Sequence, residues 1–313
     1  ATWGGIGAVI GYALGTAFPL LILITLGSKF RNSFPKAKTL IEVIRLKFGK
    51  QLFKLILFLT IFYMVIFLIA EVTAVSILVN YISGTSLWIT ALIVVTSSLV
   101  YTLYGGLRAS IFTDSIQFIV FIILLVIAIS FLVSFNSTQF NFEFINLNKP
   151  NLLSVKYFPN FTAGLTFFIA VAATNLFHQG NWQRVYAAKN EDVLNKSLIF
   201  AFIVIIPVVL FMGFSGLVAT SIDSNIRPDL GFFFLLLNDQ TKFLSTIIII
   251  LGLSLTISTV DTLINAISSL IVVDGKAAFN FSKNTNYFKF SKYFIVGLSI
   301  IAFIVASKGF SIL

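Results

Sequence analysis

Long apolar runs constrain the fold of this chain more than any other feature of its sequence. Eight stretches are apolar over about 20 residues or more, which is the length a helix needs to cross a bilayer. In lipid, backbone polar groups must be hydrogen-bonded within the protein, and unbroken apolar runs favour helices because barrel strands alternate. The sequence therefore predicts an all-α, polytopic membrane protein with one transmembrane domain over residues 1–313. The predicted spans are 5–27, 55–82, 86–104, 112–134, 160–181, 197–221, 244–272 and 293–313.

The composition excludes several classes of protein. Hydrophobic residues make up 58% of the 313 residues and charged residues only 10%, whereas soluble domains carry roughly a quarter charged residues. The chain has no cysteine and one histidine, His178, so disulfides and cysteine- or histidine-based metal sites are not expected. No pairing of a nucleophile with a base is visible in the sequence, so we do not expect an enzyme.

Basic residues lie mainly on one side of the predicted spans. One set of alternate loops holds Lys29, Arg31, Lys36, Lys38, Arg45, Lys47, Lys50, Lys54, Arg108, Arg184, Lys189, Lys196, Lys276, Lys283, Lys289 and Lys292. The other set holds Lys149, Lys156, Arg227 and Lys242. The positive-inside rule makes the richer side cytoplasmic and places the first residue outside. We therefore expect a plasma-membrane protein with a bilayer partner, and no nucleic-acid partner.

The seventh predicted span carries a polar stripe. Ser254, Ser258, Asp261, Asn265 and Ser268 follow at intervals of four and three residues, which places them on one face of a helix. Such a stripe can hold neighbouring helices together, because hydroxyls and amides pair across membrane helices. A carboxylate near the bilayer centre is costly unless it meets a partner, an ion or water. Asp261 therefore favours a solute or ion pathway.

Two features of the membrane spans and one of the loop between them indicate further structure. Gly7, Gly11 and Gly15 recur at every fourth position and predict a ridge that lets a neighbouring backbone come close. Glu71 is a second carboxylate inside a span, for which pairing and pathway roles are equally open. Between these spans, residues 39–43 predict a short helix on the cytoplasmic surface.

Residues 101–117 combine a glycine turn with an acidic helix start. Gly105 and Gly106 predict a tight turn, and Arg108 indicates that the turn is cytoplasmic. Asp114 precedes Gln117 by three residues, which is the spacing of a capping box at a helix N-terminus. Capping explains this carboxylate well, and ion handling is the alternative.

The inner end of the fifth span is unusually polar. Asn175, His178 and Gln179 lie among aromatic side chains and a glycine, which indicates a broken or water-lined segment. His178 is either a proton carrier or a hydrogen-bonded residue at a helix end. We expect Arg184 at the level of the lipid headgroups.

Three ordered stretches resemble the sodium:solute symporter family. They are YT-x-YGGL-x-A…TD-x-x-Q at 101–117, FHQGNWQRVYAAKN at 177–190, and STVDTLINAISS at 258–269 followed by Asp274. The resemblance implies the inverted-repeat fold shared with LeuT, with a substrate site near the bilayer midplane beside broken helices. On that fold the eight spans correspond to the second to ninth core helices. A first core helix is then expected ahead of Ala1 and a tenth after Leu313.

The resemblance also implies roles for individual residues. Ser258 and Thr259 match the family's adjacent sodium-binding hydroxyls, and the carbonyl group of Leu255 matches a third ligand. Asp114 matches the carboxylate associated with sodium binding or release, and Asp261 matches a common acidic position of the family.

We therefore predict a sodium-coupled secondary active symporter that imports a small polar organic solute by alternating access. Sodium would be the co-transported ion, without an organic cofactor, and the oligomeric state stays open. The predicted solute or ion pathway contains Glu71, Asn175, His178, Gln179 and Asp261. One alternative is a proton-coupled permease that uses Asp261, Asp114 or His178 as carrier. A non-transporting membrane sensor or scaffold is the other.

Overall fold

The computed structural model of the chain is helical, with no strand in the residues that it describes, which are 4–135, 142–154, 156–223, 225–237, 242–278 and 286–310. The long helices are α1 (Gly5–Ser33), α3 (Lys50–Ser83), α4 (Leu87–Phe135), α7 (Phe158–Phe177), α9 (Glu191–Ile222), α11 (Lys242–Val273) and α13 (Tyr287–Ala306). Shorter helices are α2 (Leu40–Phe48), α5 (Phe142–Asn148), α6 (Pro150–Leu153), α8 (Gln179–Ala187), η1 (Pro228–Leu230), α10 (Gly231–Leu237) and α12 (Gly275–Ala278).

Seven helices in the described ranges are long and apolar enough to cross a membrane, where the sequence predicted eight spans. The difference lies in α4, because this one helix contains both predicted spans 86–104 and 112–134. Gly106 interrupts α4 with φ 56° and ψ −146°, which is not helical. Glycine reaches this positive φ without the steric cost that a side chain would add.

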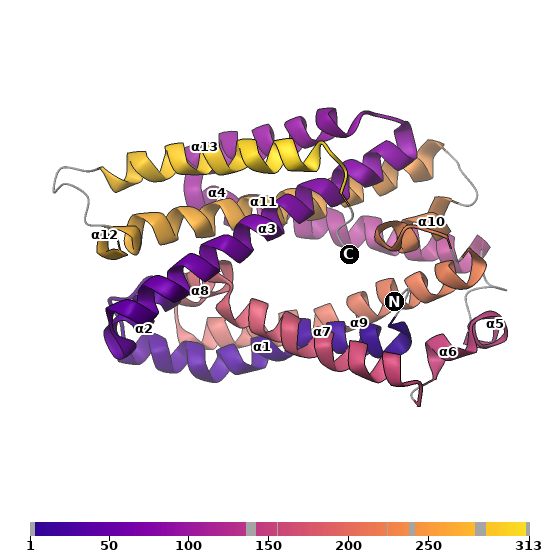
Figure 1. The fold of residues 1–313 in the computed structure, drawn as a ribbon, viewed down its shortest axis with the longest axis horizontal. Helices are drawn as coiled ribbons and strands as arrows, with labels where there is room; N and C mark the ends of the chain where they lie inside the picture. The colour runs from indigo at the N-terminus through magenta and orange to yellow at the C-terminus, as the bar shows by residue number, and fades with distance from the viewer. Residues whose placement is uncertain are drawn as a thin grey trace.

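Contacts on either side of Gly106 show that α4 reverses direction there. Tyr101 donates a hydrogen bond to Asp261 Oδ2 at 2.8 Å, and Thr113 donates to the same oxygen at 3.3 Å. Twelve residues of straight helix would separate these two positions by about 18 Å. The two halves of α4 therefore lie on either side of a turn, as the ribbon shows (Figure 1).

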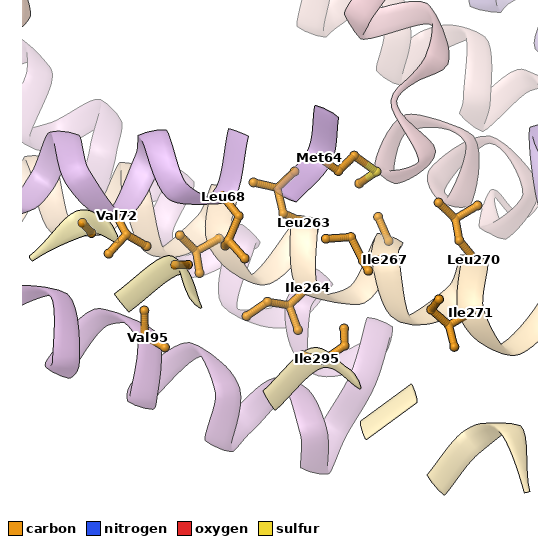
Figure 2. Packing of buried hydrophobic residues seen from close by; sticks show 14 of the residues in the cluster. Met64, Leu68, Val72, Val95, Leu263, Ile264, Ile267, Leu270, Ile271 and Ile295 are labelled. Atoms are coloured by element: carbon orange, nitrogen blue, oxygen red, sulfur yellow. The ribbon is translucent and has the colours of Figure 1, made fainter. Parts of the chain in front are cut away.

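The long helices form two layers (Figure 1). In one layer α1 packs against α7 and α9, and in the other α11 packs against α3, α4 and α13. The core of the second layer comes from α11 residues that recur at helical spacing, and Leu263, Ile264 and Ile267 meet Leu68 and Val72 of α3 there (Figure 2). Val95 of α4 and Ile295 of α13 complete this contact.

Glycines allow α1 and α7 to pack closely. A Cβ atom added at Gly7 would collide with the carbonyl group of Asn160, and one added at Gly11 would collide with Gly164. At Gly15 an added Cβ would lie 3.0 Å from the carbonyl oxygen of Phe167. The close-packing ridge predicted from these glycines is confirmed.

The short helix predicted around residues 39–43 is α2. Thr39 caps it by accepting a hydrogen bond from the Glu42 backbone at 3.0 Å. The Thr39 hydroxyl in turn donates to the buried Asp274 at 2.8 Å. This bond ties α2 to the end of α11.

Candidate ion and solute site

A cavity of about 570 Å³ lies between the two layers. Its walls come from α1, α7 and α9 of the first layer, from α3 and α11 of the second, and from η1 with the start of α10. Its lining includes Tyr12, Glu71, Phe167, Asp229, Phe232, Phe233, Leu255 and Thr259. Its volume falls within the range of small-molecule sites, roughly 300–1,000 Å³.

Two of the predicted sodium ligands border this cavity. Leu255 and Thr259 both line it, and the Thr259 hydroxyl donates to the Leu255 carbonyl oxygen at 3.1 Å. Ser258 does not line the cavity, and its hydroxyl donates to Asp114 Oδ1 at 2.5 Å. The structure thus brings Asp114 to Ser258, one residue from the cavity wall.

Asp114 does not cap a helix, so the capping interpretation is wrong. The helix runs through this position, because the break in α4 lies at Gly106. Asp114 Oδ2 instead forms an ion pair with Arg184 at 2.6 Å, and Arg184 also donates to the Thr262 hydroxyl at 3.0 Å. The expectation that Arg184 lies among lipid headgroups is therefore also wrong, because its guanidinium joins α8 to α4 and α11.

Asp261 is enclosed by hydrogen-bond donors. Its side chain is 0% exposed and accepts hydrogen bonds from Tyr101, Ser110, Thr113 and Thr262 at 2.8, 3.1, 3.3 and 3.3 Å. Buried carboxylates of this kind are stabilised by donors that point at the charge. Asp261 does not line the cavity, and in this structure it holds α11 to the turn of α4.

The polar motif after α7 interrupts the helix, and its side chains form hydrogen bonds with the backbone groups at the two helix ends. His178 lies between α7 and α8, where its Nδ1 accepts a hydrogen bond from the Gly180 backbone at 3.1 Å. Asn181 and Trp182 donate to the carbonyl groups of Asn175 and Leu176 at 2.9 and 2.7 Å. These side chains replace the backbone bonds that the interruption removes.

The surroundings of His178 favour a neutral ring. Burial and, to a smaller extent, the nearby charge of Arg184 together lower the pKa of His178 to about 4. A ring nitrogen that caps a helix must also be unprotonated to accept the Gly180 hydrogen bond. These two observations argue against a proton-carrying role.

The remaining predicted pathway residues divide between the cavity and the helix break. Glu71 of α3 lines the cavity. Asn175 and Gln179 do not, because Asn175 bonds to its own helix at 3.0 Å and Gln179 approaches Ser269 at 3.5 Å. Tyr12, Phe167 and Asp229 were not predicted as site residues, because their proximity depends on the packing of helices that are distant in the sequence.

Comparison with known proteins assigns the family. The model of the "Sodium:solute symporter family" matches residues 3–309. The chain belongs to this family. It is a multi-pass membrane protein, and the members and relatives that it matches are transporters, not enzymes.

Two known proteins are similar to this chain. The chain is 24% identical over 277 residues to the "Spermidine transporter DUR31" of Candida albicans, covering 88% of this chain and 52% of the relative. It therefore spans about half the length of that curated relative. A solved structure of a Na+-coupled sialic acid symporter, in a substrate-bound outward-open state, matches with a TM-score of 0.73 and 16% identity. The match covers 97% of this chain and 68% of that one, and it confirms the predicted inverted-repeat fold.

Proposed function

We propose that this protein imports a small polar organic solute across the plasma membrane, coupled to sodium. The observation that carries the proposal is the cavity between the layers, since Leu255 and Thr259 border the same space as Glu71. An ion bound at α11 and a solute beside α3 would then lie in one cavity. Each would stabilise the conformation that binds the other, which is the linkage that symport requires.

The other predicted site residues bond to one another within the protein, and this supports a structural role for them. Asp114 holds the Ser258 hydroxyl at 2.5 Å, while Arg184 balances the charge of Asp114. Ser258 would have to turn from Asp114 toward the cavity, or share its oxygen, in order to contact sodium together with Thr259. Asp261 and His178 are satisfied by internal hydrogen bonds, which favours sodium over a proton as the coupling ion.

The relatives do not determine the charge of the solute. The fungal relative is named for spermidine and the structural relative for sialic acid, and these compounds carry opposite charges at neutral pH. We include both amines and acids in the range of solutes to be tested.

Sodium binding tests the proposal directly. We expect the purified full-length transporter to bind radioactive sodium, and Thr259→Val to weaken this binding by roughly 5- to 150-fold, because an unmade polar contact in a dry site costs about 1–3 kcal/mol. Ser258→Ala should weaken it over the same range. Ser254→Ala, one turn away on the same helix, is the matched control and should leave the binding curve unchanged.

An unaltered sodium curve in both Thr259→Val and Ser258→Ala would contradict the site. If all three variants instead lose a similar, small amount of thermal stability with no change in sodium binding, the stripe only holds helices together.

A further inference from the structure

The cavity contains one carboxyl group, that of Glu71, with no hydrogen-bond or ion-pair partner among the described residues. Glu71 lies twelve residues before Ser83, where α3 ends, and is therefore about 18 Å along the helix from that end. No residue in the described ranges forms a hydrogen bond or ion pair with this carboxylate, and its side chain is partly exposed toward the cavity. A carboxylate at this depth needs a cation or a proton as its partner.

The rest of the lining does not supply that partner. Among the described residues that border the cavity, none is lysine, arginine or histidine. The second carboxylate, Asp229, already forms an ion pair with Arg227 at 3.2 Å. When it is ionised, Glu71 therefore gives the cavity an excess negative charge, which attracts a cation and repels an anionic solute.

Two pairs of aromatic rings share the cavity with Glu71. Tyr12 of α1 and Phe167 of α7 lie edge to face, with ring centroids 6.1 Å apart. Phe232 and Phe233 lie edge to face at 5.2 Å. Aromatic faces attract cations, and the attraction strengthens where water is excluded.

We propose that the cavity binds an organic cation, with the ammonium group of an alkylamine paired to Glu71 and its carbon chain among the aromatic rings. This proposal rests on the proposed transport function and specifies its solute class. A carboxylate and aromatic rings supply both the charge and the apolar surface that an alkylammonium ion presents. The volume of about 570 Å³ leaves room for more than one amine-bearing segment.

Solute-stimulated uptake of radioactive sodium into proteoliposomes tests the proposal with probes of matched size. We use 1,4-diaminobutane, 1-aminobutane, 1-butanol and butanoate with the full-length transporter, and liposomes without protein serve as the control. We expect both amines to stimulate sodium uptake, and butanol and butanoate to have no effect.

Two variants locate the binding group. Glu71→Gln should raise the amine concentration for half-maximal stimulation by roughly 10- to 100-fold, the range for losing a charged partner. Glu143→Gln, the same change on an exposed residue of α5 outside the cavity, should match the wild type. Phe167→Leu should raise the concentration several-fold, and it serves as the decisive variant if Glu71→Gln does not fold.

The outcomes separate this proposal from the transport function. Stimulation by butanol or butanoate, no response to the amines, or equal amine responses in wild type and Glu71→Gln overturns the assignment, while sodium binding that depends on Thr259 leaves the transport function standing. If radioactive sodium does not bind the wild type at all, the transport function fails, and the amine assignment fails with it.

Discussion

At the scale of single residues, the polar side chains in the membrane are divided between those with partners and those without. Asp114 and Asp261 are held by Arg184 and by four hydroxyl donors. Glu71 has no such partner in the part of the chain that the structure describes. All three carboxylates were visible in the sequence, but their partners were not, because Arg184 is 70 residues from Asp114 and Ser110 is 151 from Asp261.

His178 gives a prediction of pH dependence at this scale. Its pKa is about 4 in the folded protein against an ordinary 6.5, so the unfolded chain takes up the proton first as the pH falls. The contribution of His178 to stability should therefore be constant above pH 6.5 and decrease below it, by at most about 1.4 kcal/mol per pH unit until pH 4. Melting temperatures in detergent between pH 7.5 and 5.5 measure this.

The matched control is His178→Asn, because asparagine also caps helices but does not titrate in this range. Its stability should lose the pH dependence assigned to residue 178. The same slope in the variant and the wild type would show that other groups cause the change.

At the scale of helices, glycine positions decide how closely elements pack. Gly11→Ala should destabilise the protein by about 1–3 kcal/mol, because the new methyl group meets the backbone of Gly164, which cannot move aside as a side chain would. Gly297→Ala in α13 is the control, since a Cβ added there meets nothing within 4 Å. It should stabilise its helix by up to about 1 kcal/mol. Thermal unfolding of the two variants compares them, and equal effects would contradict the close packing of α1 and α7.

The helices and their approximate positions could be predicted from the lengths of the apolar runs. The break at His178 could be predicted from the polar residues around it. The reversal at Gly106 was expected as a turn between two spans, and the structure keeps helical backbone on both sides of it. Helix ends were less accurate: α3 begins at Lys50, ahead of the predicted residue 55, since basic side chains extend a helix beyond the apolar core. The cavity could not be predicted, because its wall combines five long helices from two layers.

At the scale of the whole molecule, the charge asymmetry gives a prediction of orientation. The chain has no cysteine, so single cysteines can be labelled without background. We expect Ser33→Cys to resist an impermeant maleimide in intact cells and Asn148→Cys to react, because the end of α1 lies on the side with more basic residues. Permeabilised cells should label both positions. Labelling of Ser33→Cys alone in intact cells would reverse the proposed topology.

The bonds around Asp261 join segments of the membrane domain that are made at different times during synthesis. Ser110 and Thr113 enter the membrane about 150 residues before Asp261 exists. Before Asp261 is made, the Thr113 hydroxyl still has acceptors, because it also donates to the carbonyl groups of Ala109 and Ser110 at 3.0 Å. Tyr101 has its bond to Asp261 only after α11 arrives. A ribosome that has not yet made α11 therefore carries an α4 segment whose bonds to Asp261 are still unmade.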